Sequence, residues 1–107
     1  MLLDFDVDGI YYGYTDSYCI YVVERGRIIE QYSYNSFRDF VYRLLILLTT
    51  ETAFAEAAKH PCDGEDPRRQ AFAIQHDLLM KVDPYYAARF REDTMKLLKK
   101  YPFHDKR

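Results

Sequence analysis

The sequence is poor in the residues from which catalytic and metal sites are commonly built. Its 107 residues include no tryptophan, three histidines and two cysteines. Cys19 and Cys62 show no framework spacing, so a disulfide-stapled fold is excluded and both are expected as reduced thiols. The spacing of His60, Cys62 and His76 matches no zinc motif, and a structural zinc site needs a fourth ligand. We therefore predict no metal site, no cofactor and no catalytic residue.

Long apolar segments are also missing. The longest strongly apolar run covers residues 40–48 and is interrupted by Arg43, whereas a membrane-spanning helix needs about 20 apolar residues. The first eight residues, MLLDFDVD, carry acids where a secretory signal would carry bases, and no cleavage pattern follows. We expect no membrane partner and a cytoplasmic location.

What the sequence does contain is abundant hydrophobic and aromatic material. Hydrophobic residues make up 49% and charged residues 30% of the chain, as in globular proteins, and the length predicts a single domain over residues 1–107. Eleven tyrosines and seven phenylalanines are present. Tyrosine is enriched at protein interfaces, because it is both apolar and hydrogen-bonding. A small β-rich core also uses aromatic residues, so this composition alone locates no interface.

Charge is distributed unevenly along the chain. Residues 1–24 carry five acids and no lysine or arginine, whereas residues 84–107 carry seven bases and three acids. Such polarity in a small domain suggests a charged partner on at least one side. The alternative is that the two oppositely charged ends simply face each other.

Alternation with a period of two residues predicts strands in the first third of the chain. Residues 3–8 alternate apolar and acidic side chains, as in a half-buried strand. Residues 18–24 (YCIYVVE) and 27–34 (RIIEQYSY) are rich in β-branched and aromatic residues. A tight turn at Arg25-Gly26 would join them, because glycine supplies positive φ. The expected arrangement is an antiparallel meander of three or four strands.

Helical spacing replaces this alternation after Ser36, which is a candidate helix cap. Apolar residues then recur with helical periodicity to Leu48, and the helix is expected to continue to Lys59 or to kink at the intervening threonines. Asp66-Pro67 and Asp83-Pro84 are start signals for two further helices. The fold class is α+β, with the meander packed against three or four C-terminal helices. Residues 103–107 are expected to form a loose tail.

The opening segment resembles a calcium-binding loop, because Asp4, Asp6 and Asp8 alternate and Gly9 follows. An EF-hand also needs a helix on each side and a glutamate at position 12, which here is Thr15. Calcium binding by this mode is therefore rejected. Three carboxylates on one face of a strand are either a solvated face that protects a sheet edge, or an acidic stripe for basic residues of a partner.

The tyrosines that follow strengthen the second interpretation. Alternation places Tyr12 and Tyr14 beside the aspartates and Tyr11 in the core, although a bulge at Gly9 or Gly13 would reverse this. Acids would steer a cationic partner and aromatic rings would hold it. Glu30 and Tyr32 could extend the patch. The predicted partner-binding residues are Asp4, Asp6, Asp8, Tyr12, Tyr14 and Asp16.

Three other functions are weighed against this binding surface. Basic residues of the last helix could bind nucleic acid, but they are spread over its solvent side, and a pI of about 5.9 argues against general nucleic-acid binding. A small nuclease or other hydrolase could use His76 with nearby carboxylates. A scaffold or oligomerisation module is the third possibility, and the sequence leaves the oligomeric state open.

The segment YCIYVVERGRIIEQYSYNSFRDFVYRLL is a tyrosine-rich hairpin that runs into one long apolar helix. In size, composition and layout it resembles the small immunity proteins of bacterial toxin systems, particularly those paired with contact-dependent growth-inhibition toxins. The resemblance implies a non-catalytic cytosolic protein that binds a cognate toxin domain, often a basic nuclease, and blocks its active site or an adjacent surface. A phage-encoded inhibitor of a host nuclease complex would have similar features.

Overall fold

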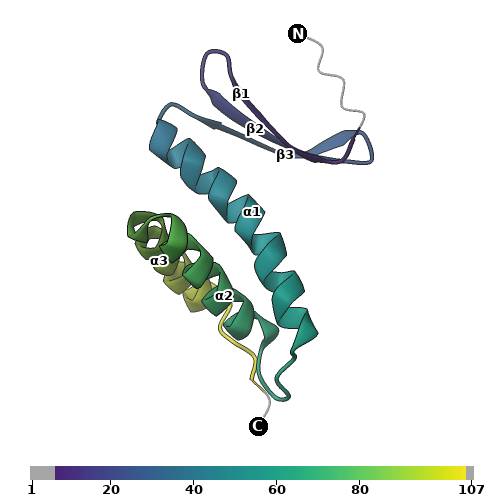
Figure 1. The fold of residues 1–107 in the computed structure, drawn as a ribbon, viewed down its shortest axis with the longest axis vertical. Helices are drawn as coiled ribbons and strands as arrows, with labels where there is room; N and C mark the ends of the chain where they lie inside the picture. The colour runs from purple at the N-terminus through teal and green to yellow at the C-terminus, as the bar shows by residue number, and fades with distance from the viewer. Residues whose placement is uncertain (1–6, 106–107) are drawn as a thin grey trace. The chain divides into compact units, whose positions relative to one another are not determined.

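Three strands come first in the chain and three helices follow, which confirms the predicted α+β layout (Figure 1). The computed structural model describes residues 7–105. The chain clusters into two units, Met1–Leu44 and Leu45–Arg107, and each is described in turn. None of the helices within residues 7–105 has the length and apolar character needed to cross a membrane.

The first unit contains an antiparallel sheet with the strand order β1-β2-β3. Its strands are β1 (Gly9–Tyr14), β2 (Tyr18–Glu24) and β3 (Arg27–Tyr34). The turn between β2 and β3 has positive φ at both central residues, 54° at Arg25 and 74° at Gly26. This is the geometry of a two-residue hairpin turn whose twist matches that of the strands, so the predicted turn is confirmed.

The strands differ from the prediction at the N-terminal side. The structure starts β1 at Gly9, after Val7 and Asp8, and residues 3–6 of the expected first strand lie outside the described residues. Gly9 has φ of 156°, which side-chain-bearing residues rarely adopt. Within the described residues, no strand precedes Gly9. The sheet's irregularity lies elsewhere, at the extra residue Ile29 of β3.

The second unit continues helix α1 (Phe37–Lys59) and adds α2 (Pro67–Val82) and α3 (Pro84–Lys100). Of the two expected alternatives, α1 follows the first and continues as a single helix to Lys59. Threonine hydroxyls along it donate to carbonyls one turn back, for example Thr50 to Ile46 at 2.6 Å. Asp66 and Asp83 cap α2 and α3 as predicted, each accepting a hydrogen bond from a backbone amide.

One polar side chain lies in the core of this unit. Gln75 of α2 is buried, and its amide donates to the hydroxyls of Thr49 and Thr50 at 2.9 and 2.8 Å. Apolar neighbours complete the core, with Ala53, Ala71, Leu79 and Ala87 all buried. Because a buried amide is costly unless bonded, these contacts fix the relative rotation of α1 and α2 within the unit.

The segment after α3 is held in place rather than loose, which corrects the tail prediction for residues 103–105. The buried Asp66 carboxylate accepts from the Arg68 side chain at 2.9 Å and from the backbone amide of His104 at 2.8 Å. Asp105 in turn accepts from the Asp66 amide at 2.8 Å and pairs with Arg69 at 2.7 Å. The strap formed by residues 101–105 is therefore fastened to the start of α2.

We predict that Asp66→Asn lowers the stability of the protein and flattens its dependence on acid pH. The Arg68 side chain, and after it the His104 amide, hold the pKa of the Asp66 carboxyl well below its ordinary value of 3.8. Because folding lowers this pKa, the stabilisation is present above the ordinary value and is lost as the pH falls below it. At neutral pH, thermal unfolding followed by circular dichroism should show a Tm lower by roughly 5 °C.

The difference between Asp66→Asn and the unsubstituted protein should shrink progressively below about pH 4, because the Asp66 carboxyl then protonates in the unfolded chain while it stays ionised in the folded one. Asp63→Asn, a substitution at an exposed aspartate of the same loop, is the matched control and should leave Tm unchanged. Equal Tm values for all three proteins at neutral pH would contradict a stabilising role for the strap.

Candidate partner-binding surface

One face of the sheet is lined with tyrosines. Residues paired across antiparallel strands point to the same side of the sheet. The register pairs Ile20 of β2 with Tyr12 of β1 and Tyr32 of β3. The next row on this side pairs Tyr18 with one tyrosine on each flanking strand. We call this surface the tyrosine face, and its members are Tyr12, Tyr14, Tyr18, Tyr32 and Tyr34.

The first two turns of α1 pack against the tyrosine face within the same unit. Phe40 is buried and stacks on Tyr18, with ring centroids 5.2 Å apart, while Phe37 meets the same tyrosine edge-on at 5.5 Å. Tyr12 lies 6.2 Å from Phe40. Ile20 beneath these rings is fully buried. Because these contacts share Tyr18 and Phe40, the rings form one connected cluster. Each aromatic pair stabilises the unit by about 0.5–1.5 kcal/mol beyond the contribution of its buried area.

The predicted sides of the first tyrosines are corrected by this register. Tyr11, expected in the core, lies on the face opposite Ile20, and its hydroxyl donates to the Val7 carbonyl at 2.5 Å. Tyr12 and Tyr14 lie on the side that Phe40 covers. This is the reversal that a bulge at Gly9 or Gly13 was expected to produce, although β1 pairs with β2 without a register shift.

The β3 half of the tyrosine face already holds a cation. The guanidinium of Arg43, on α1, lies 4.8 Å from the centre of the Tyr32 ring and donates to the Tyr34 hydroxyl at 3.0 Å. The Tyr32 hydroxyl donates to Glu30 at 3.2 Å. Burial, and then the neighbouring Glu30 carboxylate, raise the pKa of Tyr32, so its hydroxyl stays protonated at neutral pH.

The β1 half is open by comparison. Tyr12 is 67% and Tyr14 64% exposed. Tyr14 leans on Tyr18, at 4.8 Å between ring centres. Asp16 is exposed in the turn that joins β1 to β2. The predicted site thus retains two tyrosines side by side, with an acid beyond them.

The remaining predicted acids are not all gathered there. Asp8 lies at the other end of β1, where its carboxylate accepts from the backbone amide of Arg25 at 2.7 Å. Asp4 and Asp6 lie outside the described residues. The structure therefore places Tyr12 and Tyr14 together, with Asp8 and Asp16 at opposite ends of their strand.

Sequence reasoning missed the aromatic partners contributed by β2 and α1. Phe37 and Phe40 stand three residues apart, so they share one helix face. Tyr18 and Ile20 alternate in the same way as Tyr12 and Tyr14, so they share one sheet face. Combining these two periodicities could have found the cluster. Arg43 had no comparable signal, because its position over Tyr32 depends on how the helix lies on the sheet.

Candidate catalytic residues of the second unit line two separate cavities. His76 borders a groove of about 320 Å³ between α2 and α3, together with Phe72, Asp77 and Arg91. Cys62 lies on the loop before α2, at a cavity of about 360 Å³. Cys62 and His76 are thus not combined in one site. Residues 7–105 contain no group of three histidine, cysteine or acidic side chains arranged to hold a metal ion.

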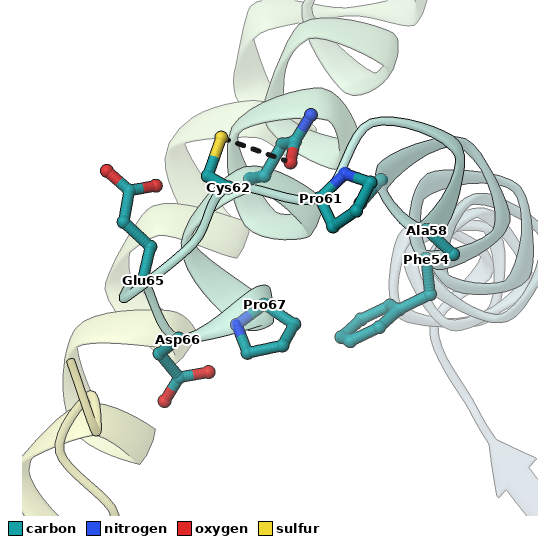
Figure 2. Close-up of a pocket in the computed structure, with 9 residues that line it drawn as sticks. Phe54, Ala58, Pro61, Cys62, Glu65, Asp66 and Pro67 are labelled. Atoms are coloured by element: carbon teal, nitrogen blue, oxygen red, sulfur yellow. Dashed lines mark hydrogen bonds between the residues drawn. The ribbon is translucent and has the colours of Figure 1, made fainter. Parts of the chain in front are cut away.

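The cavity beside Cys62 is mainly apolar (Figure 2). The rings of Phe54 and Pro67 face each other across it, and the Cys62 thiol points toward the Gln70 amide oxygen, 3.9 Å away. At that distance the thiol is only a weak donor. The residues that line this cavity include no histidine to activate the thiol, and most of them contribute apolar surface.

We predict that Arg43→Met destabilises the first unit by about 1–2 kcal/mol, because the substitution keeps an apolar stem but removes the guanidinium from the Tyr32 ring and the Tyr34 hydroxyl. Urea unfolding followed by far-ultraviolet circular dichroism measures this free energy. Arg27→Met, at an exposed position of β3, should change it by less than about 0.5 kcal/mol. An equal effect of the two substitutions would show that the Arg43 contacts contribute nothing specific.

Comparison with known protein families identifies a match over most of the chain. The model of the family Imm63, described as immunity protein 63, matches residues 15–96. This range covers β2, β3, α1, α2 and most of α3, and it includes Tyr18, Phe40 and Arg43 but begins after Tyr14. No curated protein and no solved structure matches the sequence.

Proposed function

This chain belongs to the immunity protein 63 family, and from that premise we propose that it neutralises its cognate toxin by occlusion. The resemblance to bacterial toxin-immunity proteins is thereby confirmed, and membership of such a family implies a toxin protein as partner. In our proposal the protein acts in the cytoplasm, without catalysis or cofactor, by covering the active or substrate-binding surface of a toxin domain that is a basic nuclease of a contact-dependent growth-inhibition system.

The observation that carries this proposal is the exposed aromatic surface of the first unit. Tyr12, Tyr14 and Phe37 are each at least 60% exposed, yet each contacts the half-buried Tyr18 or the buried Phe40. Rings held from beneath lose little conformational entropy on binding, and tyrosine is enriched among interface hot spots. A connected group of exposed aromatic residues is typical of a protein-binding surface.

The charge of the same segment supports a cationic partner. Asp8 and Asp16 are exposed at the two ends of β1, and Asp4 and Asp6 precede them in the chain. A nuclease that grips phosphates presents lysine and arginine on its substrate-binding surface. Acidic residues opposite such a surface would speed association and block the substrate path at once. We therefore keep the proposed contact residues Asp4, Asp6, Asp8, Tyr12, Tyr14 and Asp16.

The first test identifies the toxin and asks whether the protein protects against it. The immobilised protein is exposed to lysate of its native host, and a protein retained at near-stoichiometric yield is identified by mass spectrometry. That protein is then expressed in a sensitive strain with and without the immunity protein. We expect growth arrest alone and restored growth on co-expression, with His76→Ala protecting as well as the unsubstituted chain. Toxicity that persists on co-expression would overturn the proposed function, and protection lost with His76→Ala would favour the hydrolase alternative.

The role of the acids is tested with two variants, each of which loses four negative charges from a different part of the chain. Changing Asp4, Asp6, Asp8 and Asp16 to asparagine should slow association with the toxin by about tenfold at low salt, and the effect should fade at about 0.5 M salt. Stopped-flow or surface-plasmon measurements give this rate.

The matched control removes the same number of charges from the second unit. It consists of four substitutions at exposed acids, namely Glu51→Gln, Asp63→Asn, Asp77→Asn and Glu92→Gln. If this control slows association as much as the N-terminal variant, overall charge rather than the proposed surface steers the encounter.

A further inference from the structure

The two halves of the tyrosine face are built alike but filled differently. On the β3 half, Tyr32 and Tyr34 stand two residues apart with their rings 6.4 Å apart and nearly parallel, at 8°. Arg43 lies over the first of these rings and bonds the hydroxyl of the second. Two tyrosines at this spacing, with Glu30 beside them, thus form a seat for one arginine side chain.

The β1 half repeats this pattern, and among the described residues no arginine lies over the Tyr12 or Tyr14 ring. Tyr12 and Tyr14 also stand two residues apart on the same face, in register with Tyr32 and Tyr34 through β2. Cations that lie over aromatic rings elsewhere in the chain include Arg43 over Tyr32 and Arg69 over Phe103. Asp16 follows Tyr14 by two residues, in the turn after β1, and is exposed.

The spacing suits a guanidinium. Side chains two residues apart on one face of a strand are about 7 Å apart, and a cation interacts with an aromatic ring from within about 6 Å of its centre. One planar guanidinium can therefore contact both rings. Its remaining donors would be free to reach a carboxylate, to which arginine bonds in bidentate fashion. Because β1 is an edge strand, a side chain from another protein can enter alongside it.

We propose that Tyr12 and Tyr14 form a seat for an arginine of the toxin domain, with Asp16 as the carboxylate that pairs with it. This inference rests on the proposed function for the identity of the partner, and it names the group that the partner inserts. The arginine would occupy on β1 the position that Arg43 occupies on β3. Support comes from charge complementarity at Asp16 and from the occupied equivalent within the same sheet.

Two double variants separate a ring-face contact from other uses of these tyrosines. Tyr12→Phe/Tyr14→Phe keeps both ring faces and loses both hydroxyls, whereas Tyr12→Leu/Tyr14→Leu keeps apolar volume and loses the rings. With the toxin identified by co-expression, the leucine variant should raise Kd by about 10- to 30-fold and the phenylalanine variant by less than about threefold. Tyr101→Leu, at a tyrosine that is 61% exposed in the second unit, should leave Kd unchanged.

The other outcomes are equally informative. Equal Kd values for the leucine variant and the unsubstituted protein would overturn the arginine seat. The proposed function would still stand in that case if the unsubstituted protein protects cells from the toxin. Equal losses in the phenylalanine and leucine variants also overturn it, because they assign the contact to the hydroxyls. Circular dichroism of each variant confirms folding, which is expected because both side chains are mostly exposed.

A second measurement needs no toxin. The ring protons of Tyr12 and Tyr14 are followed by nuclear magnetic resonance while N-acetyl-argininamide is added, and N-acetyl-citrullinamide is the neutral control of the same shape. We expect concentration-dependent shifts with the arginine probe alone, and smaller shifts at Tyr32 and Tyr34, which Arg43 already contacts. Identical responses to the two probes would overturn the arginine seat, even if the protein neutralises a toxin. A response to the arginine probe alone would support the seat, even if no toxin is neutralised.

Discussion

The packing of Phe40 onto Tyr18, above the fully buried Ile20, is the contact on which the first unit depends. A three-stranded sheet has one face to cover before it can be stable, and in this unit the first turns of α1 cover it. The register of the three strands places the tyrosines on that face. Phe37 and Phe40 lie three residues apart on α1, so both rings can pack against these tyrosines. Loss of this contact would remove both the core of the unit and the support beneath its exposed tyrosines.

The same residues therefore stabilise the fold and form the proposed binding surface. Tyrosine permits this because the ring can pack on its neighbours while its outer edge and hydroxyl remain in water. The second unit is built by different means, with a buried glutamine between α1 and α2 and a strap of residues 101–105 fastened at Asp66. Its cavities beside Cys62 and His76 are separate and lie outside the proposed surface.

Much of the local structure followed from short-range patterns in the sequence. Strands 18–24 and 27–34, the Arg25-Gly26 turn and the aspartate caps of α2 and α3 were all predicted, because each depends on residues a few positions apart. The prediction of a loose C-terminal tail was wrong because that segment is held by contacts between residues far apart in the sequence. The strap needs Asp66 to meet Asp105, and no periodicity links residues so far apart. The side of Tyr11 was predicted wrongly because the alternation was extended across Gly9, where φ is positive.

The candidate site was predictable only in part for the same reason. Tyr12 and Tyr14 could be named from alternation, but the ring cluster with Phe40 and the seating of Arg43 on Tyr32 require the helix to lie on the sheet. The match to immunity protein 63 identifies the class of partner, which no spacing in this chain specifies. From the acidic residues of the surface we propose that this partner is cationic.

Hydrogen exchange measured by mass spectrometry, on the protein alone and with its toxin, tests the central claim most directly. If the tyrosine face is the binding surface, toxin should slow exchange in residues 9–20 and in the first turns of α1, and should leave α2 and α3 unchanged. Protection confined to α2 and α3, with β1 and β2 exchanging as in the free protein, would contradict the account.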